Sequence, residues 1–147
     1  MGSIKNNNYG TTPSTASIVA QFTVYTNPRN LLYLLKTLEK EYINISAFTI
    51  QEFDNESVFK FIVGKNKSQS ANDIDITRSI LKQYRFNFDE SRVVRVNSSK
   101  NKAMLTSYYS ELIKSLAVYN SYLGEEGSII FETCCPTKTL NALSQLY

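Results

Sequence analysis

Apolar and polar residues alternate from Ile18 to Thr26, which predicts a strand with one buried face. Asn27-Pro28 ends this alternation, and leucines then recur at three- and four-residue spacing as far as Tyr42. That spacing predicts an amphipathic helix from about Pro28 to Tyr42. Pro28 suits the first helical turn, where its missing N–H costs nothing.

The same two patterns, alternation for strands and three- or four-residue spacing for helices, continue along the chain. Alternation over residues 43–53 and 57–63 predicts two strands, and Asp54-Asn55 between them predicts a hairpin turn. A helix carrying Ile76, Ile80 and Tyr84 on one face follows, with Asn72 or Asp73 as its cap. The residues Arg92–Val96 are then expected to form a fourth strand.

The pattern restarts after a polar break at residues 98–102. A helical stripe over 104–116, strands over 118–123 and 128–134, and a last helix opened by Pro136 repeat the order helix, hairpin, helix. The offset between the copies is roughly 70 residues, which indicates an internal repeat. The strand near 93–97 closes the first copy and opens the second. The second copy has no closing strand of its own, which would leave an open strand edge.

Each copy reads as βαββα with or without a final strand, which predicts a ferredoxin-like βαββαβ arrangement of the α+β class. Its sheet is expected to be antiparallel with the helices on one face. We expect a disordered polar N-terminus over 1–16, a first unit over 17–97, and a second, incomplete unit over 93–147 that shares the joining strand.

The sequence contains no histidine, which excludes His-based acid–base catalysis, a Ser–His–Asp triad and His-ligated zinc. The two cysteines, Cys134 and Cys135, are adjacent and make no disulfide framework. A bond between them would need strained geometry. We interpret them as one buried and one more exposed thiol, and we expect neither a cofactor nor a metal.

Positive charge is concentrated between residues 60 and 102, which carry ten Lys or Arg and four acids. Such a segment can attract nucleic acid. Because the charges are spread over helix, strand and loop, we favour a solvated surface and keep a nucleic-acid-binding ferredoxin-like protein as an alternative. No apolar run is long enough to cross a bilayer, and residues 1–15 lack a signal-peptide pattern. We therefore expect a cytoplasmic protein.

Two phrases of the sequence resemble the ACT domain family. The first is the strand that runs into Thr26-Asn27-Pro28-Arg29-Asn30-Leu31 and a leucine-rich helix, and the second is Tyr42-Ile43-Asn44-Ile45-Ser46-Ala47. Residues 17–147 as a whole resemble a tandem ACT pair, with the first unit clearer than the second. ACT domains often have Asp-x-Pro-Gly at this turn, where the chain has Arg29-Asn30 after the proline.

The resemblance implies a regulatory domain that binds small ligands, usually amino acids. Such ligands lie between the first strand–helix loop and the second strand of a neighbouring unit. The implied ligand-binding residues come from both places, with Arg29 as a partner for a carboxylate: Asn27, Pro28, Arg29, Asn30, Leu31, Asn44 and Ser46. From its position alone, Asn27 is also expected to cap the helix.

We therefore expect a non-catalytic, stand-alone regulatory module that forms a homodimer, has a protein partner and possesses no enzyme activity. The alternative is a homo-oligomeric assembly or adaptor protein without a small ligand. Tyrosines that cluster in the second unit are the expected interface residues, with core packing as the other reading: Tyr108, Tyr109, Tyr119 and Tyr122.

Overall fold

The computed structural model describes residues 15–65, 69–97, 104–144 and 146. Its helices and strands follow the predicted order. They are β1 (Thr15–Thr26), α2 (Pro28–Lys40), β2 (Ile45–Phe53), β3 (Glu56–Val63), α3 (Ala71–Gln83), β4 (Asn87–Asn97), α4 (Met104–Leu112), β5 (Val118–Leu123), a 3-10 turn (Glu125–Gly127), β6 (Ile129–Thr133) and α5 (Pro136–Ser144).

Several predicted boundaries were wrong by a few residues. Helix α2 ends at Lys40 because Tyr42 adopts a left-handed conformation with φ of 58°. The cap of α3 is Ser70, whose hydroxyl accepts a hydrogen bond from the Asp73 backbone at 3.4 Å. Strand β4 begins at Asn87 rather than Arg92, and α4 ends at Leu112 rather than near residue 116. Residues 1–14 lie outside the described residues, and β1 already includes Thr15 and Ala16.

The chain divides into two compact units. One contains residues 19–92, and its strands follow the order β2-β3-β1-β4. The pairs β1–β3 and β2–β3 are both antiparallel. In the ferredoxin-like fold, the fourth strand lies beside the first, and the third strand lies between the first and the second. The strands of the 19–92 unit follow this order.

The other unit contains residues 93–147 and, of the described N-terminal residues, 15–18. Its strands follow the order β1-β4-β6-β5, with antiparallel β4–β6 and β5–β6 pairs. The start of β1 therefore lies beside β4 at the place where we expected an open edge. If β4 is taken as the first strand of this unit and β1 as its fourth, the order of the strands across the sheet is the same as in the 19–92 unit.

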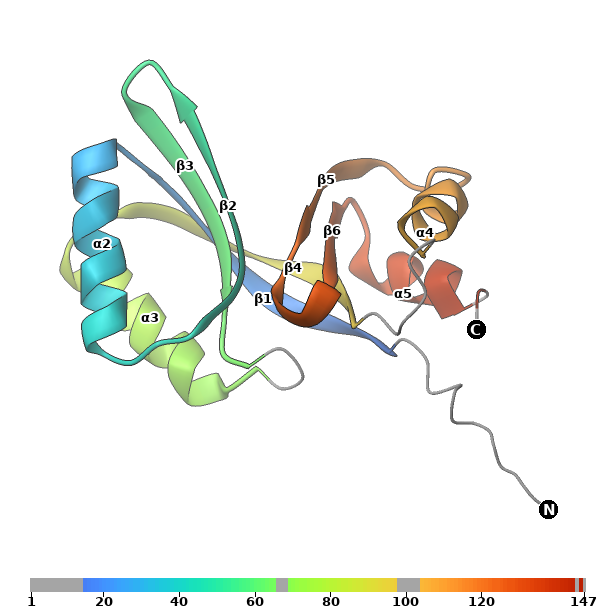
Figure 1. Ribbon diagram of the computed structural model, residues 1–147, viewed down its shortest axis with the longest axis horizontal. Helices are drawn as coiled ribbons and strands as arrows, with labels where there is room; N and C mark the ends of the chain where they lie inside the picture. The colour runs from blue at the N-terminus through green and yellow to red at the C-terminus, as the bar shows by residue number, and fades with distance from the viewer. Residues whose placement is uncertain (1–14, 66–68, 98–103, 145, 147) are drawn as a thin grey trace. The chain divides into compact units, whose positions relative to one another are not determined.

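The core of the 19–92 unit lies between its helices and one face of its strands (Figure 1). Leu34 and Leu38 of α2 and Leu81 of α3 are fully buried against the strands. The rings of Phe22, Phe59 and Phe61 form a stacked series on that face. Phe59 and Phe61 are two residues apart on β3 and therefore point to the same face of the sheet, where Phe22 of β1 lies beside them.

The second unit has a smaller core built in the same way. Tyr108 and Leu112 of α4 and Leu143 of α5 pack with Val94, Val96, Ile129 and Phe131 of the strands. The rings of Tyr108 and Phe131 meet edge to face, with their centroids 6.4 Å apart. Within each unit the helices thus cover one face of an antiparallel sheet, as predicted.

Turns and caps explain where the elements of the 19–92 unit begin and end. The Asn27 side chain accepts a 2.8 Å hydrogen bond from the Asn30 backbone and caps α2, as expected. Asp54 and Asn55 have positive φ values of 44° and 70°, which is the geometry of a two-residue turn between β2 and β3. None of the helices in the described part of the chain is both long and apolar enough to cross a membrane.

Candidate functional site

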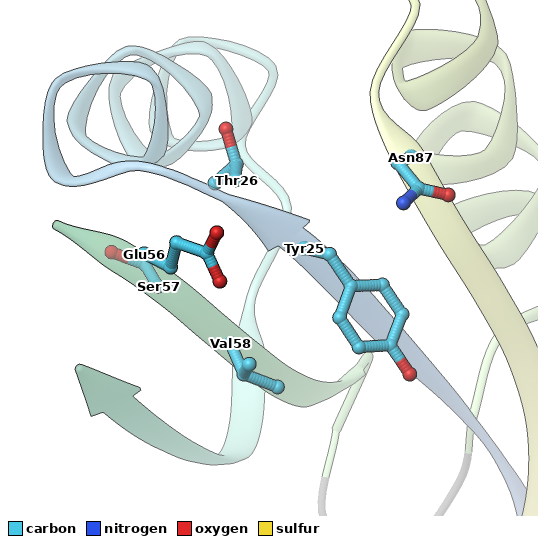
Figure 2. A pocket seen from close by; sticks show the side chains of 6 residues that line it. All are labelled: Tyr25, Thr26, Glu56, Ser57, Val58 and Asn87. Atoms are coloured by element: carbon cyan, nitrogen blue, oxygen red, sulfur yellow. The ribbon is translucent and has the colours of Figure 1, made fainter. Parts of the chain in front are cut away.

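Two hollows flank the end of β1 in the 19–92 unit. The first, which we call the Glu56 hollow, has a volume of about 340 Å³ and is lined by Tyr25, Thr26, Glu56, Ser57, Val58 and Asn87. Figure 2 shows the Glu56 side chain extending from β3 toward the end of β1, and Asn87 on β4 beyond the Tyr25 ring. Tyr25 also donates a 3.3 Å hydrogen bond to Asp89 on β4.

The second, which we call the Arg85 hollow, has a volume of about 380 Å³. It shares three residues with the Glu56 hollow and adds residues from the first half of α2 and from the loop between α3 and β4. Its lining consists of Tyr25, Thr26, Asn30, Tyr33, Tyr84, Arg85, Phe86 and Asn87.

Two tyrosines form one wall of the Arg85 hollow. The Tyr33 and Tyr84 rings meet edge to face with their centroids 5.4 Å apart. Their hydroxyl groups also interact, and a hydrogen bond with Tyr33 raises the pKa of Tyr84 above its ordinary value. This pair connects α2 to the end of α3, so the wall is fixed by contacts between the two helices.

Arg85 owes its position to the way in which α3 ends. Tyr84 terminates the helix, and Arg85 follows in the left-handed region with φ of 59°. Glycine is the usual residue at this position because a Cβ atom destabilises the left-handed conformation. Arg85 is exposed, and among the described residues its guanidinium group forms no ion pair.

Charge is distributed unequally between the two hollows. Of the described residues that line them, Arg85 is the one cation and Glu56 the one carboxylate. Hydroxyl and amide groups supply the other polar positions. The first turn of α2, which is described throughout, contains no acidic residue to offset the positive end of the helix dipole. The Arg85 hollow is therefore suited to an anionic group.

The structure places the predicted residues of the first turn of α2 in different environments. Asn30 lines the Arg85 hollow, whereas Leu31 is buried in the core with 4% of its surface exposed. Asn27 is the helix cap, Pro28 is in the first turn, and Arg29 is exposed beside it. None of these last three is among the described lining residues of either hollow.

Asn44 and Ser46 lie at the opposite end of the same unit. Thr26 pairs with Ser57 at the start of β3, whereas Ile45 pairs with Val63 at its end. Asn44 and Ser46 are thus separated from the predicted residues at the start of α2 by about the length of that helix, roughly 20 Å at 1.5 Å per residue. A single unit does not bring them together.

Hydrogen bonds further limit Asn44 and Ser46. The Asn44 amide donates to the Gly64 carbonyl at 2.8 Å. Ser46 lies at a β-bulge, is 1% exposed, and donates to the Ile62 carbonyl at 3.3 Å. Ser46 therefore supports the sheet from a buried position, and the alternation of the sequence did not reveal the bulge that buries it.

The sequence analysis named Asn30 and missed the other seven lining residues of the Arg85 hollow: Tyr25, Thr26, Tyr33, Tyr84, Arg85, Phe86 and Asn87. The segments that carry them are about 50 residues apart in the chain, so no local motif joins them. A partial signal existed, because Tyr33 lies off the leucine stripe of its helix and Arg85 stands where a helix end usually has glycine.

An apolar surface occupies the second unit. A hollow of about 520 Å³ is lined by Leu105, Thr106, Tyr109, Ser110, Ile113 and Ser121. Leu105, Tyr109 and Ile113 follow one another at four-residue spacing, and each is about half exposed. Tyr119 and Leu123 on β5, which is the last strand in its sheet order, are each 66% exposed.

The predicted interface tyrosines divide between core and surface. Tyr108 is 2% exposed and packs in the core, so its place on an interface is corrected to core packing. Tyr109 and Tyr119 belong to the exposed apolar surface. Tyr122 is half-buried, and burial raises the pKa of its hydroxyl above the ordinary value.

Two arginines of the basic segment are ion-paired or buried among the described residues. Arg78 is bonded to Glu90, with Nε–Oε1 and Nη2–Oε2 distances of 2.9 and 2.8 Å, and to Asp75 at 2.9 Å. Arg95 is 1% exposed. Lys67, Lys100 and Lys102 lie outside the described residues. This arrangement gives little support to the nucleic-acid alternative.

Comparison with known proteins identifies the fold. No protein-family model matches the chain, and no curated protein matches it. Protein BT0572 from Bacteroides thetaiotaomicron is similar over 89% of this chain and 90% of its own, with a TM-score of 0.73 and 19% identity. The ligand-free regulatory subunit of aspartate kinase from Thermus thermophilus is similar over 92% and 97%, with a TM-score of 0.59 and 11% identity.

A structure of aspartokinase alpha and beta subunits is similar over 90% of this chain and 95% of its own, with a TM-score of 0.61 and 12% identity. At such low identities, these likenesses are evidence for the fold alone. They agree with the strand orders and the helix-covered sheet faces described above. The chain therefore has an ACT-like, ferredoxin-type α+β fold, of the kind found in an aspartate kinase regulatory subunit.

Proposed function

We propose that this protein is a non-catalytic, ACT-like regulatory module that binds a small carboxylate ligand, such as an amino acid, in the hollows at the end of β1. The observation that carries the proposal is the Arg85 hollow, in which a guanidinium group that forms no ion pair with any described residue lies near the start of α2. The likeness to a regulatory subunit of aspartate kinase supports the regulatory role.

The chemistry of the lining suits a small zwitterion. A guanidinium group binds a carboxylate through two parallel hydrogen bonds, so Arg85 is the proposed anchor. Asn30 and the tyrosine hydroxyls supply further hydrogen bonds, and Glu56 in the adjoining hollow offers a partner for an ammonium group. A volume of about 380 Å³ is within the range of small-molecule sites.

The position of Asn44 is consistent with a homodimer. Within one unit, Asn44 lies at the opposite end of the sheet from Asn27, so it could reach the same ligand only from a second unit or chain, whereas Ser46 is buried in the sheet. We propose that a second copy of the chain takes that place. The two free cysteines suit a reducing compartment, which supports a cytoplasmic location.

Isothermal titration calorimetry with each of the common L-amino acids tests the proposal. We expect at least one of them to bind. Its carboxamide, which lacks the negative charge, should bind at least ~10-fold more weakly, because a hydrogen bond to a charged group contributes roughly 1.5–3 kcal/mol. The absence of binding by every amino acid, or equal affinity for acid and amide, would contradict the proposal.

A second candidate function is assembly without a small ligand, and the exposed apolar surface of α4 and β5 favours it. Strand β5 pairs with β6 on one side, and among the described residues no strand pairs with its other side, which suits a partner strand. A second copy could pair there across a two-fold axis, with Tyr109 and Tyr119 at the interface. Light scattering at micromolar concentration tests this candidate, and a monomer would contradict it.

A further inference from the structure

Aromatic side chains make up half of the lining of the Arg85 hollow. They come from β1, from α2 and from the end of α3 with the connection that follows it: Tyr25, Tyr33, Tyr84 and Phe86. Each of the three tyrosines is between 42% and 50% exposed. Single exposed aromatic side chains are common on protein surfaces, so exposure alone indicates nothing. The meeting of aromatic side chains from separate segments in one hollow is typical of a small-molecule site.

Contacts within the 19–92 unit hold these rings in place. Tyr33 and Tyr84 meet edge to face across the two helices, with their centroids 5.4 Å apart. The Tyr25 ring lies near the end of β1 (Figure 2), and its hydroxyl donates to Asp89 at 3.3 Å. Phe86 packs against the core, and its backbone donates to the Leu81 carbonyl at 2.9 Å. Because the rings are already positioned, a ligand that packs against them loses little affinity to their ordering.

The charge of the hollow decides which kind of ligand suits these rings. Aromatic faces attract cations as well as other rings. Arg85 lies in the same hollow, where it disfavours a second positive charge, and none of the described lining residues of this hollow is a carboxylate. Glu56 belongs to the adjoining hollow. The combination that remains is a carboxylate for the guanidinium group and an aromatic ring for the tyrosines.

We propose that the ligand of the Arg85 hollow is an amino acid with an aromatic side chain, and that Tyr25 and Tyr33 select the ring; this step rests on the proposed function and adds the ligand class. The ligand carboxylate binds Arg85, and the ligand ring packs against the tyrosines in the edge-to-face or offset geometry that aromatic pairs prefer. Such a pair increases affinity by ~2- to 12-fold beyond the effect of the buried area. An aliphatic side chain of the same size would gain the burial alone.

Isothermal titration calorimetry of the full chain with L-phenylalanine and L-cyclohexylalanine tests this selection. The two ligands have the same carboxylate and ammonium groups, and they differ in that the second has a saturated ring. We expect phenylalanine to bind ~2- to 12-fold more tightly. L-Leucine, which is smaller and apolar, and L-lysine, which carries a second positive charge, should both bind more weakly than phenylalanine.

Tyr33→Leu removes one ring without changing the core, because Tyr33 lies off the buried leucine stripe of α2 and leucine is a good helix former. This variant and Tyr25→Leu should each reduce the preference for phenylalanine over cyclohexylalanine. Tyr33→Phe and Tyr25→Phe retain the rings and should retain the preference. Tyr42→Leu is the matched control, because Tyr42 is 94% exposed and lines neither hollow among the described residues. Its preference should equal that of the wild type.

The outcomes separate this step from the proposed function. Cyclohexylalanine or leucine that binds as tightly as phenylalanine would overturn the aromatic selection and leave the carboxylate site standing. An unchanged preference in both Tyr25→Leu and Tyr33→Leu would also overturn it. Binding by no amino acid would contradict the proposed function as well. Circular dichroism shows whether each variant is folded, and the comparison of ligands on the wild type does not depend on any variant.

Discussion

Replacing Arg85 by glycine should strengthen the fold and weaken ligand binding at the same time. Tyr42 provides a matched control, because it also follows a helix with a left-handed backbone, with φ of 58° against 59° for Arg85. Tyr42 is 94% exposed and lines neither hollow among the described residues. Tyr42→Gly and Arg85→Gly therefore relieve the same backbone strain at a control position and at the proposed site.

The expected gain in stability follows from two opposing terms. The left-handed conformation costs an ordinary residue roughly 1–2 kcal/mol. Glycine loses about 0.5–1 kcal/mol more backbone entropy on folding than alanine does. The difference favours glycine by about 0.5–1 kcal/mol at each position. For a chain of this size, 1 kcal/mol corresponds to a rise of roughly 2–4 °C in melting temperature.

The expected loss of binding concerns Arg85 alone. Removal of its guanidinium group deletes a charge-assisted contact of about 1.5–3 kcal/mol, which corresponds to a 10- to 150-fold rise in Kd. Tyr42→Gly should leave Kd unchanged. The two variants should thus have similar melting temperatures and clearly different affinities.

Calorimetric unfolding, together with titration of the amino acid that binds the wild type, measures both quantities. The reasoning about Arg85 would be refuted if Arg85→Gly bound as tightly as Tyr42→Gly. The reasoning about the helix ends would be refuted if either variant melted below the wild type.

Three further predictions concern a helix cap, an ion pair and the exposed surface. Asn27→Ala should reduce the free energy of unfolding by about 1 kcal/mol, and Asn27→Ser, which retains a capping oxygen, should largely preserve it in denaturant titrations. Glu90→Gln should destabilise the protein at pH 7, and the effect should disappear in acid once folded Glu90 is protonated: Arg78 lowers the pKa of Glu90, so the stabilisation is present above the unfolded pKa of about 4.3 and is lost as pH falls through the folded pKa. Tyr109→Lys should convert a dimer into a monomer in light scattering if the apolar surface is the interface, and an unchanged mass would contradict this.

Much of the fold follows from the sequence because periodicity reports burial directly. Phe22 belongs to the alternating pattern of a strand, and Leu34 and Leu38 belong to the leucine stripe of a helix. All three residues meet in the core. The closing strand of the second unit could not be inferred in this way. Residues 15–18 continue the strand that begins the first unit, and no periodicity indicates that they lie in another unit.

The candidate site was less accessible to sequence reasoning. Asn30 was named from the family resemblance, but Arg85 joins it through the packing of α2 and α3, which the Tyr33–Tyr84 contact fixes. Ser46 illustrates the opposite error. The family resemblance implied that it contacts a ligand, but a bulge turns it inward. Sequence patterns over a few residues reveal neither the packing of two helices nor the presence of a β-bulge.

Backbone amide NMR of the full chain during titration with the binding amino acid tests the central claim most directly. The account predicts that the largest shift changes occur at Asn30, Tyr33, Tyr84 and Arg85, and that the amides beside Tyr109 and Cys134 change little. Saturable binding whose shift changes lie elsewhere, with none at Arg85 or Asn30, would contradict it.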